Sequence, residues 1–198
     1  MAILPIVKYG EPVLRKRARP VPRIDAEVRR LMEDMVETML EAPGIGLAAP
    51  QIGQRSRIIV AQIEGDEVLM LANPRIIETA GEQEAWEACL SLPGLQGKVV
   101  RPARVVVRGV DQSGKTVTIE ATDLAARCLC HEIDHLHGIV FADRSPDDAI
   151  RWVFEAGKDP ETGEPQYAYE YVTREEAFAE LVRRWRAERA KRRAQKKG

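Results

Sequence analysis

The chain lacks the features of membrane and secreted proteins, and its overall charge has no excess of one sign. Three cysteines among 198 residues are too few for a disulfide framework and favour a reducing compartment. No apolar run approaches the ~20 residues of a membrane span, and the first ten residues, broken by Pro5 and Lys8, do not resemble a signal peptide. The net charge of −1 gives no overall bias toward nucleic acid. We therefore expect a cytoplasmic protein with no membrane and no DNA partner.

What remains is sufficient for one globular core. The composition is 44% hydrophobic and 31% charged, which is typical of a soluble domain, and the length suits one domain with an appended element. We predict a catalytic domain over residues 1–148. A hairpin insertion over 149–172 and a basic C-terminal helix or tail over 173–198 are predicted to be appended to it.

The pattern of apolar and turn residues predicts an α+β fold with antiparallel pairing. An N-terminal amphipathic helix is predicted at about 26–41, with Asp25 as its N-cap, and a second helix at about 124–137, capped by Asp123 and ended by Gly138. Short strands are expected between them, over 57–63, 67–72, 75–79, 83–89, 99–100, 104–110 and 115–120. The strands are separated by turn signals rather than by helices, which favours hairpins.

The C-terminal region has its own pattern. Segments 149–156 and 166–172 flank a long turn, and Thr173 with Glu176 forms a capping box for a helix that runs to about 194. This helix ends in a basic tract, Arg183 to Lys197, whose only acid is Glu188. Such a tract is either a solvated helix end or a contact for a polyanion such as ribosomal RNA.

Residues 43–53, PGIGLAAPQIG, are apolar but interrupted by glycine and proline. A buried strand disfavours this composition, whereas a loop that lies close against a ligand would use it, because glycine permits close approach of the backbone. The alternative is a tight connection after the first helix.

Histidine occurs only at 131, 135 and 137, and the first two form the motif His131-Glu132-Ile133-Asp134-His135. Positions four apart lie on one helix face, so both imidazoles can bind one metal ion while Glu132 acts as general base on a metal-bound water. His137 lies about 240° from His131 around the helix and is expected to face away.

A catalytic metal of this kind needs a third protein ligand. No histidine follows residue 137, and Phe141 occupies the position where a metzincin would place one. Glu155 has a plausible spacing for a thermolysin-like zinc metallopeptidase, although it lies in a predicted strand. Cys89, where a strand breaks before Pro93, is the other candidate. Cys130 points off the metal face of the helix and is expected to be a buried side chain.

Three segments together resemble the signature motifs of peptide deformylases, in the same order: GIGLAAPQ at 44–51, EACLS at 87–91 and HEIDH at 131–135. The resemblance spans about residues 1–145. It implies an α+β fold of mostly antiparallel sheets packed around a central HExxH helix. It also implies one divalent metal held by Cys89, His131 and His135, which is Fe²⁺ in the cell, with Zn²⁺, Ni²⁺ or Co²⁺ able to occupy the site.

The resemblance further implies a bacterial hydrolase that removes the formyl group from the N-terminal formyl-Met of newly synthesised polypeptides and releases formate. Glu132 would serve as general base and then acid, and the oxyanion would be stabilised by the Gln51 side chain and the Leu90 backbone N–H. Substrate binding would involve Ile45, Gly46, Glu87, Ala88, Leu124 and Cys128. The nascent chain meets such enzymes near the ribosome, which adds weight to ribosome contact through Arg183–Lys197.

Two departures from the motifs and two alternatives stay open. Ala88 stands where the family usually has glycine, which would cost about 1 kcal/mol if that residue needs a positive φ. Cys130 stands where the family usually has glutamine. Besides the thermolysin-like enzyme, the chain could be an inactive metal-binding, ribosome-associated module, although the retention of Glu132 and Gln51 argues against that.

Overall fold

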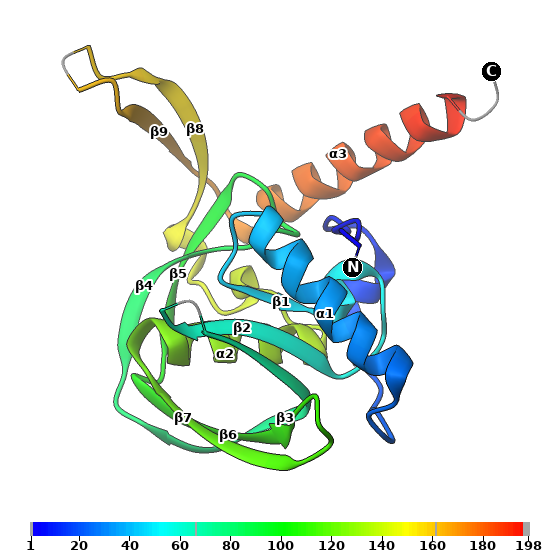
Figure 1. Cartoon of the computed structure of the whole chain (residues 1–198). Coiled ribbons are helices and arrows are strands. Elements are labelled where there is room, and N and C mark those ends of the chain that lie inside the picture. The colour runs from blue at the N-terminus through cyan, green and yellow to red at the C-terminus, as the bar shows by residue number, and fades with distance from the viewer. Residues whose placement is uncertain (1, 66, 161, 196–198) are drawn as a thin grey trace. The chain divides into compact units, whose positions relative to one another are not determined.

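A computed structural model describes residues 2–65, 67–160 and 162–195 and divides the chain into two compact units. The first unit contains Glu11–Glu84 and Val100–Val140 with the N-terminal residues up to Val7, and the second contains Lys8–Gly10, Ala85–Val99 and the chain from Phe141 onward. Helices and antiparallel strands make up both units (Figure 1), which confirms the predicted α+β class. No helix among the described residues is long and apolar enough to cross a membrane.

The first unit is built on a five-stranded sheet in the order β1-β2-β3-β6-β7, with antiparallel ladders. Its strands are β1 Gly46–Ala48, β2 Ile58–Glu64, β3 Glu67–Ala80, β6 Arg104–Val110 and β7 Thr116–Thr122. The sequence-based boundaries agree for β6 and differ by one or two residues for β2 and β7. The predicted turn between β2 and β3, Gly65-Asp66, lies partly outside the described residues.

Strand β3 corrects one prediction, because the segments 67–72 and 75–79 are a single strand. The ladder with β6 shifts register between Ala72 and Arg75, so Asn73 and Pro74 make a bulge instead of a turn. Asn73 has a φ of 52°, and its side chain exchanges two 2.8 Å hydrogen bonds with the backbone of Val21. These hydrogen bonds stabilise the bulge, which the alternation of apolar and polar residues along a strand does not reveal.

Two helices belong to the first unit, α1 Ala26–Glu41 and α2 Asp123–His137. The bounds of α1 match the prediction, and the Asp25 carboxylate accepts a 3.0 Å hydrogen bond from the Val28 N–H as an N-cap does. Gly138, with a φ of 78°, ends α2 as expected. The start of α2 differs from the prediction, because Thr122 precedes the helix and Asp123 is its first residue, with a φ of 50°.

One face of α2 packs on the five-stranded sheet and forms the main core. Leu129, Ile133 and Leu136 are buried on this face, together with the sheet residues Ile59, Ala61, Leu71, Val105, Val107 and Ala121. Cys130 is 4% exposed and belongs to the same cluster, which confirms it as a small buried side chain. The core therefore fixes the rotation of α2 about its axis and with it the direction in which the HExxH side chains point.

The second unit contains a four-stranded sheet in the order β4-β5-β8-β9. Its strands are β4 Gln83–Ala88, β5 Leu95–Arg101, β8 Ile150–Lys158 and β9 Pro165–Tyr171. The predicted strand at 99–100 is thus longer than expected. The predicted hairpin is confirmed, because β8 and β9 pair from Arg151 with Tyr171 to Lys158 with Pro165 and form a long two-stranded ribbon (Figure 1).

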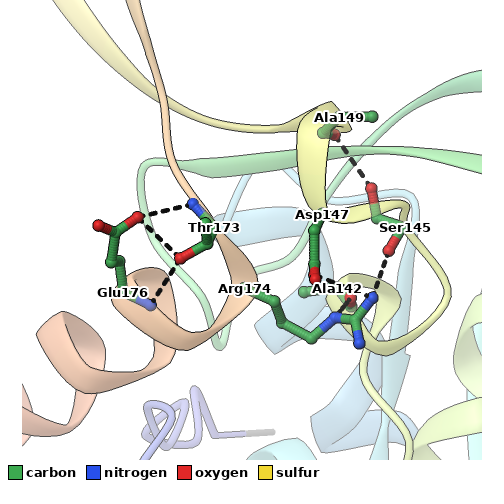
Figure 2. A network of polar contacts seen from close by, with 7 residues as sticks. All are labelled: Ala142, Ser145, Asp147, Ala149, Thr173, Arg174 and Glu176. Atoms are coloured by element: carbon green, nitrogen blue, oxygen red, sulfur yellow. Dashed lines mark hydrogen bonds and ion pairs between the residues drawn. The ribbon is translucent and has the colours of Figure 1, made fainter.

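Helix α3 Arg174–Gln195 begins at the predicted capping box (Figure 2). The Glu176 carboxylate accepts hydrogen bonds from the Thr173 N–H at 2.9 Å and the Thr173 hydroxyl at 2.7 Å. Arg174 donates to the carbonyl oxygens of Ala142 and Ser145 at 2.8 and 2.6 Å, which ties the start of the helix to the segment before β8.

Further along α3, Leu181 is 3% exposed and the Phe178 ring stacks on Tyr9 with centroids 4.6 Å apart. Trp185 lies so close to Gly10 that a Cβ there would come within 2.7 Å of the indole. Every residue from 186 to 195 is exposed. The helix is therefore anchored by its first turns up to Trp185. Beyond it, Arg189 lies over the Trp185 ring, 5.1 Å from its centroid, and the other basic side chains to Arg193 are exposed.

Candidate metal centre

Cys89, His131 and His135 form a group whose ligand atoms all lie within 4.8 Å of one another, close enough to bind one metal ion. The two imidazole rings are 5.0 Å apart at their centroids, as expected for positions i and i+4 on α2. Cys89 and His135 are 8% and 0% exposed, and His131 is partly buried. His137 does not belong to this group.

The donor set of this group fits a transition metal. One thiolate and two imidazoles are ligands that suit zinc and iron, whereas magnesium and calcium prefer oxygen. Glu155, the alternative third ligand, lies in β8 opposite Tyr167, is exposed and is outside the group. The thermolysin-like arrangement is therefore not supported.

Glu132 is 3% exposed and lies against the backbone of β1. A Cβ built on Gly46 would be 2.5 Å from Glu132 Oε1 and 2.7 Å from Cys128 Sγ. Since carbon and oxygen atoms do not approach this closely without a bond, only glycine permits β1 to run beside the general-base candidate. The sequence analysis expected glycine here to allow a close approach to a ligand; the close neighbours that the structure shows are the Glu132 and Cys128 side chains of α2.

The segment around Gly46 is more regular than predicted. Residues 43–53 were expected to form a loop, but Gly46–Ala48 pair with Ile59–Ala61 of β2, and Ala49–Ile52 form a 3₁₀ turn. Gln51 is 1% exposed, and its Oε1 accepts a 2.7 Å hydrogen bond from the Ala48 N–H. Because the amide oxygen is used in this way, the Nε2 group is the end of the side chain that can donate to a substrate.

The three residues predicted to line a pocket for methionine are differently exposed. Cys128 is buried and its thiol donates to the Ile45 carbonyl oxygen at 3.2 Å, which links α2 to the start of β1. The Ile45 and Leu124 side chains are 42% and 62% exposed. The predicted methionine-pocket residues thus come from α2 and from the residue before β1, and two of the three are exposed.

Strand β4 leads into Cys89. Glu87 is buried and Ala88 is exposed. Ala88 is not among the described residues with a positive φ, so alanine in place of the family glycine does not strain the backbone. After Cys89, the Leu92 N–H donates to the Cys89 carbonyl oxygen at 2.9 Å and closes a turn.

Two residues near the N-terminus hold this turn and were not predicted. Lys8 Nζ donates to the Leu90 carbonyl oxygen at 2.8 Å, and the Tyr9 N–H donates to the Ser91 carbonyl oxygen at 2.8 Å. Because 82 residues separate Lys8 from Leu90, no local pattern could have indicated these contacts.

A buried ion pair next to His135 was also not predicted. Arg101 donates to Asp134 at 2.5 Å, and the two side chains are 4% and 7% exposed. Asp134 occupies one of the variable positions of HExxH, so the motif predicts no role for it. The pair connects α2 to the end of β5 beside the second histidine ligand.

The chain is similar to known peptide deformylases in sequence and in structure. Residues 3–149 match the model of the polypeptide deformylase family. A peptide deformylase of Alkaliphilus metalliredigens is 53% identical over 144 residues, which cover 73% of this chain and 97% of the relative. The peptide deformylase crystal structure from Thermus thermophilus has a TM-score of 0.70 and 48% identity, covering 73% of this chain and 86% of its own. That from Synechococcus elongatus in complex with actinonin has a TM-score of 0.71 and 41% identity, covering 74% and 83%.

Proposed function

The chain belongs to the polypeptide deformylase family and is an enzyme that removes the formyl group from N-terminal formyl-Met, and we propose that it does so at the Cys89–His131–His135 group. The observation that supports this site is the gathering of one thiol and two imidazoles from distant parts of the sequence beside a buried glutamate. Hydrolysis of a formamide releases formate and a free amino terminus.

We propose Fe²⁺ as the metal in the cell, with Zn²⁺, Ni²⁺ or Co²⁺ able to replace it, because this donor set does not discriminate strongly among them. When bound, the cation lowers the pKa of a coordinated water and polarises the formyl oxygen. Cys89 would bind as a thiolate and both imidazoles as neutral rings.

Glu132 is the proposed general base. It takes the proton from the attacking water and later delivers a proton to the leaving amine. Its burial beside Gly46 holds the carboxylate in one place without competing water. Gln51 Nε2 and the Leu90 N–H are the proposed donors to the oxyanion, which develops when the formyl carbon becomes tetrahedral. Lys8, bonded to the Leu90 carbonyl, would keep that peptide unit oriented.

The substrate is proposed to bind as an extended strand. The backbones at Gly46 and Ala88 would pair with it, since both lie on β-strands. Ile45, Leu124 and Cys128 would receive the methionine side chain. Glu87, whose buried side chain lies on the opposite face of β4 from Ala88, would support the strand. Backbone pairing depends little on sequence, which suits an enzyme that acts on many nascent chains.

For the C-terminal region we propose contact with ribosomal RNA. From Arg183 to Arg193 the helix has seven basic residues and one acid, Glu188. Arg183 and Arg184 are partly neutralised by Glu180, whose pKa is lowered to about 2 by hydrogen bonds from both. Such a helix end attracts a polyanion. We also propose that the protein is cytoplasmic. We further propose that the chain is divided into a catalytic domain with an appended hairpin and a C-terminal tail.

The function is tested by measuring formate release from formyl-Met-Ala under anaerobic conditions, together with metal content. We expect turnover with about one metal ion per chain. Cys89→Ala should lose the metal, while Glu155→Ala, the matched control for the rejected ligand, should keep it. Metal retention by Cys89→Ala with loss in Glu155→Ala would contradict the proposed centre.

The ribosome contact is tested separately by co-sedimentation at low salt. Replacing Arg186, Arg192 and Arg193 by glutamine should weaken binding, because three exposed cations are lost from the helix while the Arg189–Trp185 contact is kept. The control replaces exposed Arg29 and Arg30 of α1 and a third exposed arginine, Arg75 of β3, by glutamine, which changes the net charge equally. Equal binding by both triple variants would contradict the proposal.

A further inference from the structure

Arg151 of β8 lies between two aromatic rings. Its guanidinium carbon is 3.7 Å from the centroid of Trp86 in β4 and 3.8 Å from that of Tyr169 in β9. Its Nε and Nη2 both donate to Gln96 Oε1 of β5, at 3.2 and 2.9 Å. These four side chains, here called the Arg151 platform, lie on one face of the four-stranded sheet in the second unit.

The charge of this platform is not neutralised within the described part of the chain. Gln96 is neutral, and no described carboxylate forms an ion pair with Arg151. The bonds to Gln96 use the side edge of the guanidinium. Its end edge, Nη1 with the second Nη2 hydrogen, has no acceptor among the described residues. Two parallel N–H groups at such an edge match the two oxygens of a carboxylate.

Trp86 of the Arg151 platform lies on the same face of β4 as Ala88, the residue proposed to pair with the substrate. Side chains two apart on a strand point to the same face, so Trp86 and Ala88 lie on one side and the buried Glu87 on the other. Strand β4 is also the terminal strand of its sheet, so one edge of its backbone pairs with no other strand in the described part of the chain. An extended peptide can add along such an edge.

The geometry points to a subsite for an acidic side chain of the nascent polypeptide, near its fourth residue; this inference rests on the function proposed above. Chain direction follows from the position of Cys89 after β4. A peptide whose formyl end is at Cys89 and which follows β4 runs antiparallel to it and passes Ala88 before Trp86. With the second residue of the substrate placed opposite Ala88, the residue opposite Trp86, two positions further along an extended strand, is the fourth.

The hairpin that contributes two of the four platform side chains lies beyond the part of the chain matched to the family. Arg151 and Tyr169 belong to β8 and β9, whereas the family match ends at residue 149. Exposed Tyr167 and Tyr171 continue the aromatic face on β9 on either side of Tyr169. The subsite therefore combines this chain's C-terminal hairpin with Trp86 of β4 and Gln96 of β5.

The test compares amidated peptides of the form formyl-Met-Ala-Ser-Glu and formyl-Met-Ala-Ser-Gln, with the Glu/Gln pair also placed at the third and fifth residues. We expect kcat/KM to be about threefold to fivefold higher for glutamate at the fourth position, as for a partly exposed ion pair. The preference should fall as salt rises to about 0.5 M. Formyl-Met-Ala is too short to reach the platform. Its kcat/KM therefore measures any general loss of activity in a variant, and the values for the longer peptides are divided by it.

Arg151→Gln should reduce the Glu/Gln ratio to about one, and Arg151→Lys should retain part of it, because charge remains without the planar fork. The matched control Arg29→Gln, an exposed arginine on α1, should leave the ratio unchanged. Equal kcat/KM for both wild-type peptides, or a preference that survives in Arg151→Gln, would overturn the inference. Absence of turnover of formyl-Met-Ala by the wild type would instead overturn the proposed function.

Discussion

Gly46→Ala is the most informative substitution, because it adds one methyl group beside the proposed base. The new Cβ would lie 2.5 Å from Glu132 Oε1, 2.9 Å from Glu132 Cγ and 2.7 Å from Cys128 Sγ. Relaxed contacts need about 3.5 Å, so the glutamate side chain must move by roughly 1 Å. Gly46 does not have a positive φ, so alanine meets no backbone penalty there. The carboxylate therefore moves while the fold survives.

A displacement of this size costs about 100-fold in rate when it affects a positioned catalytic group. The overpacking should also destabilise the protein by about 1–3 kcal/mol. We expect Gly46→Ala to bind metal fully, since none of the three ligands is touched, and to show kcat/KM for formyl-Met-Ala reduced about 100-fold. Formate release, metal analysis and thermal unfolding measure these three effects.

Two second-site variants separate the causes. Adding Cys128→Ala to Gly46→Ala removes the sulfur contact, which should recover stability but not rate. In a Glu132→Gln background the base is already lost, so Gly46→Ala should reduce the rate little further. Turnover by metal-loaded Gly46→Ala within about twofold of the wild type would refute the argument that Gly46 fixes the carboxylate.

Three further predictions concern neighbouring groups. Glu132→Gln should retain metal by elemental analysis and lose about 10²- to 10⁴-fold in formate release, and near-normal turnover would remove it from the role of base. Asp134→Asn should lower the free energy of unfolding by about 3–5 kcal/mol in denaturant titrations, because the buried Arg101 charge loses the carboxylate that it pairs with. A change under about 1 kcal/mol would contradict this. Lys8→Met should lower kcat by up to about tenfold, because one charge-assisted hydrogen bond to the Leu90 carbonyl oxygen is lost. Lys8→Arg should be less affected. An unchanged kcat in Lys8→Met would show that the bond does not orient this peptide unit.

Much of the site was predictable because its signals are local. The spacing of His131 and His135 places both rings on one face in any α-helix. Gly138 ends that helix, and Thr173 with Glu176 begins the last one, through contacts within four residues. The proposal of Cys89 as the third ligand came from the resemblance of EACLS to a family motif, since spacing alone left Glu155 open.

Other features depend on contacts that are distant in sequence. Residues 46–48 have a loop-like composition and become a strand only because β2 offers a ladder. The two predicted strands at 67–72 and 75–79 join because β6 pairs with both and Asn73 bonds to Val21. Pairing of this kind is decided by the partner strand, so propensity of the segment itself predicts it poorly.

The sequence by itself therefore determined the class of chemistry, because a metal-binding helix motif is set by the 3.6-residue period and needs no tertiary partner to be recognised. Only the tertiary structure decided why Gly46 must be glycine, how Arg101 compensates Asp134, and which groups surround Arg151. Each of these results from groups that are distant in sequence and meet when the sheets form, so their contacts follow from the fold and not from any local pattern.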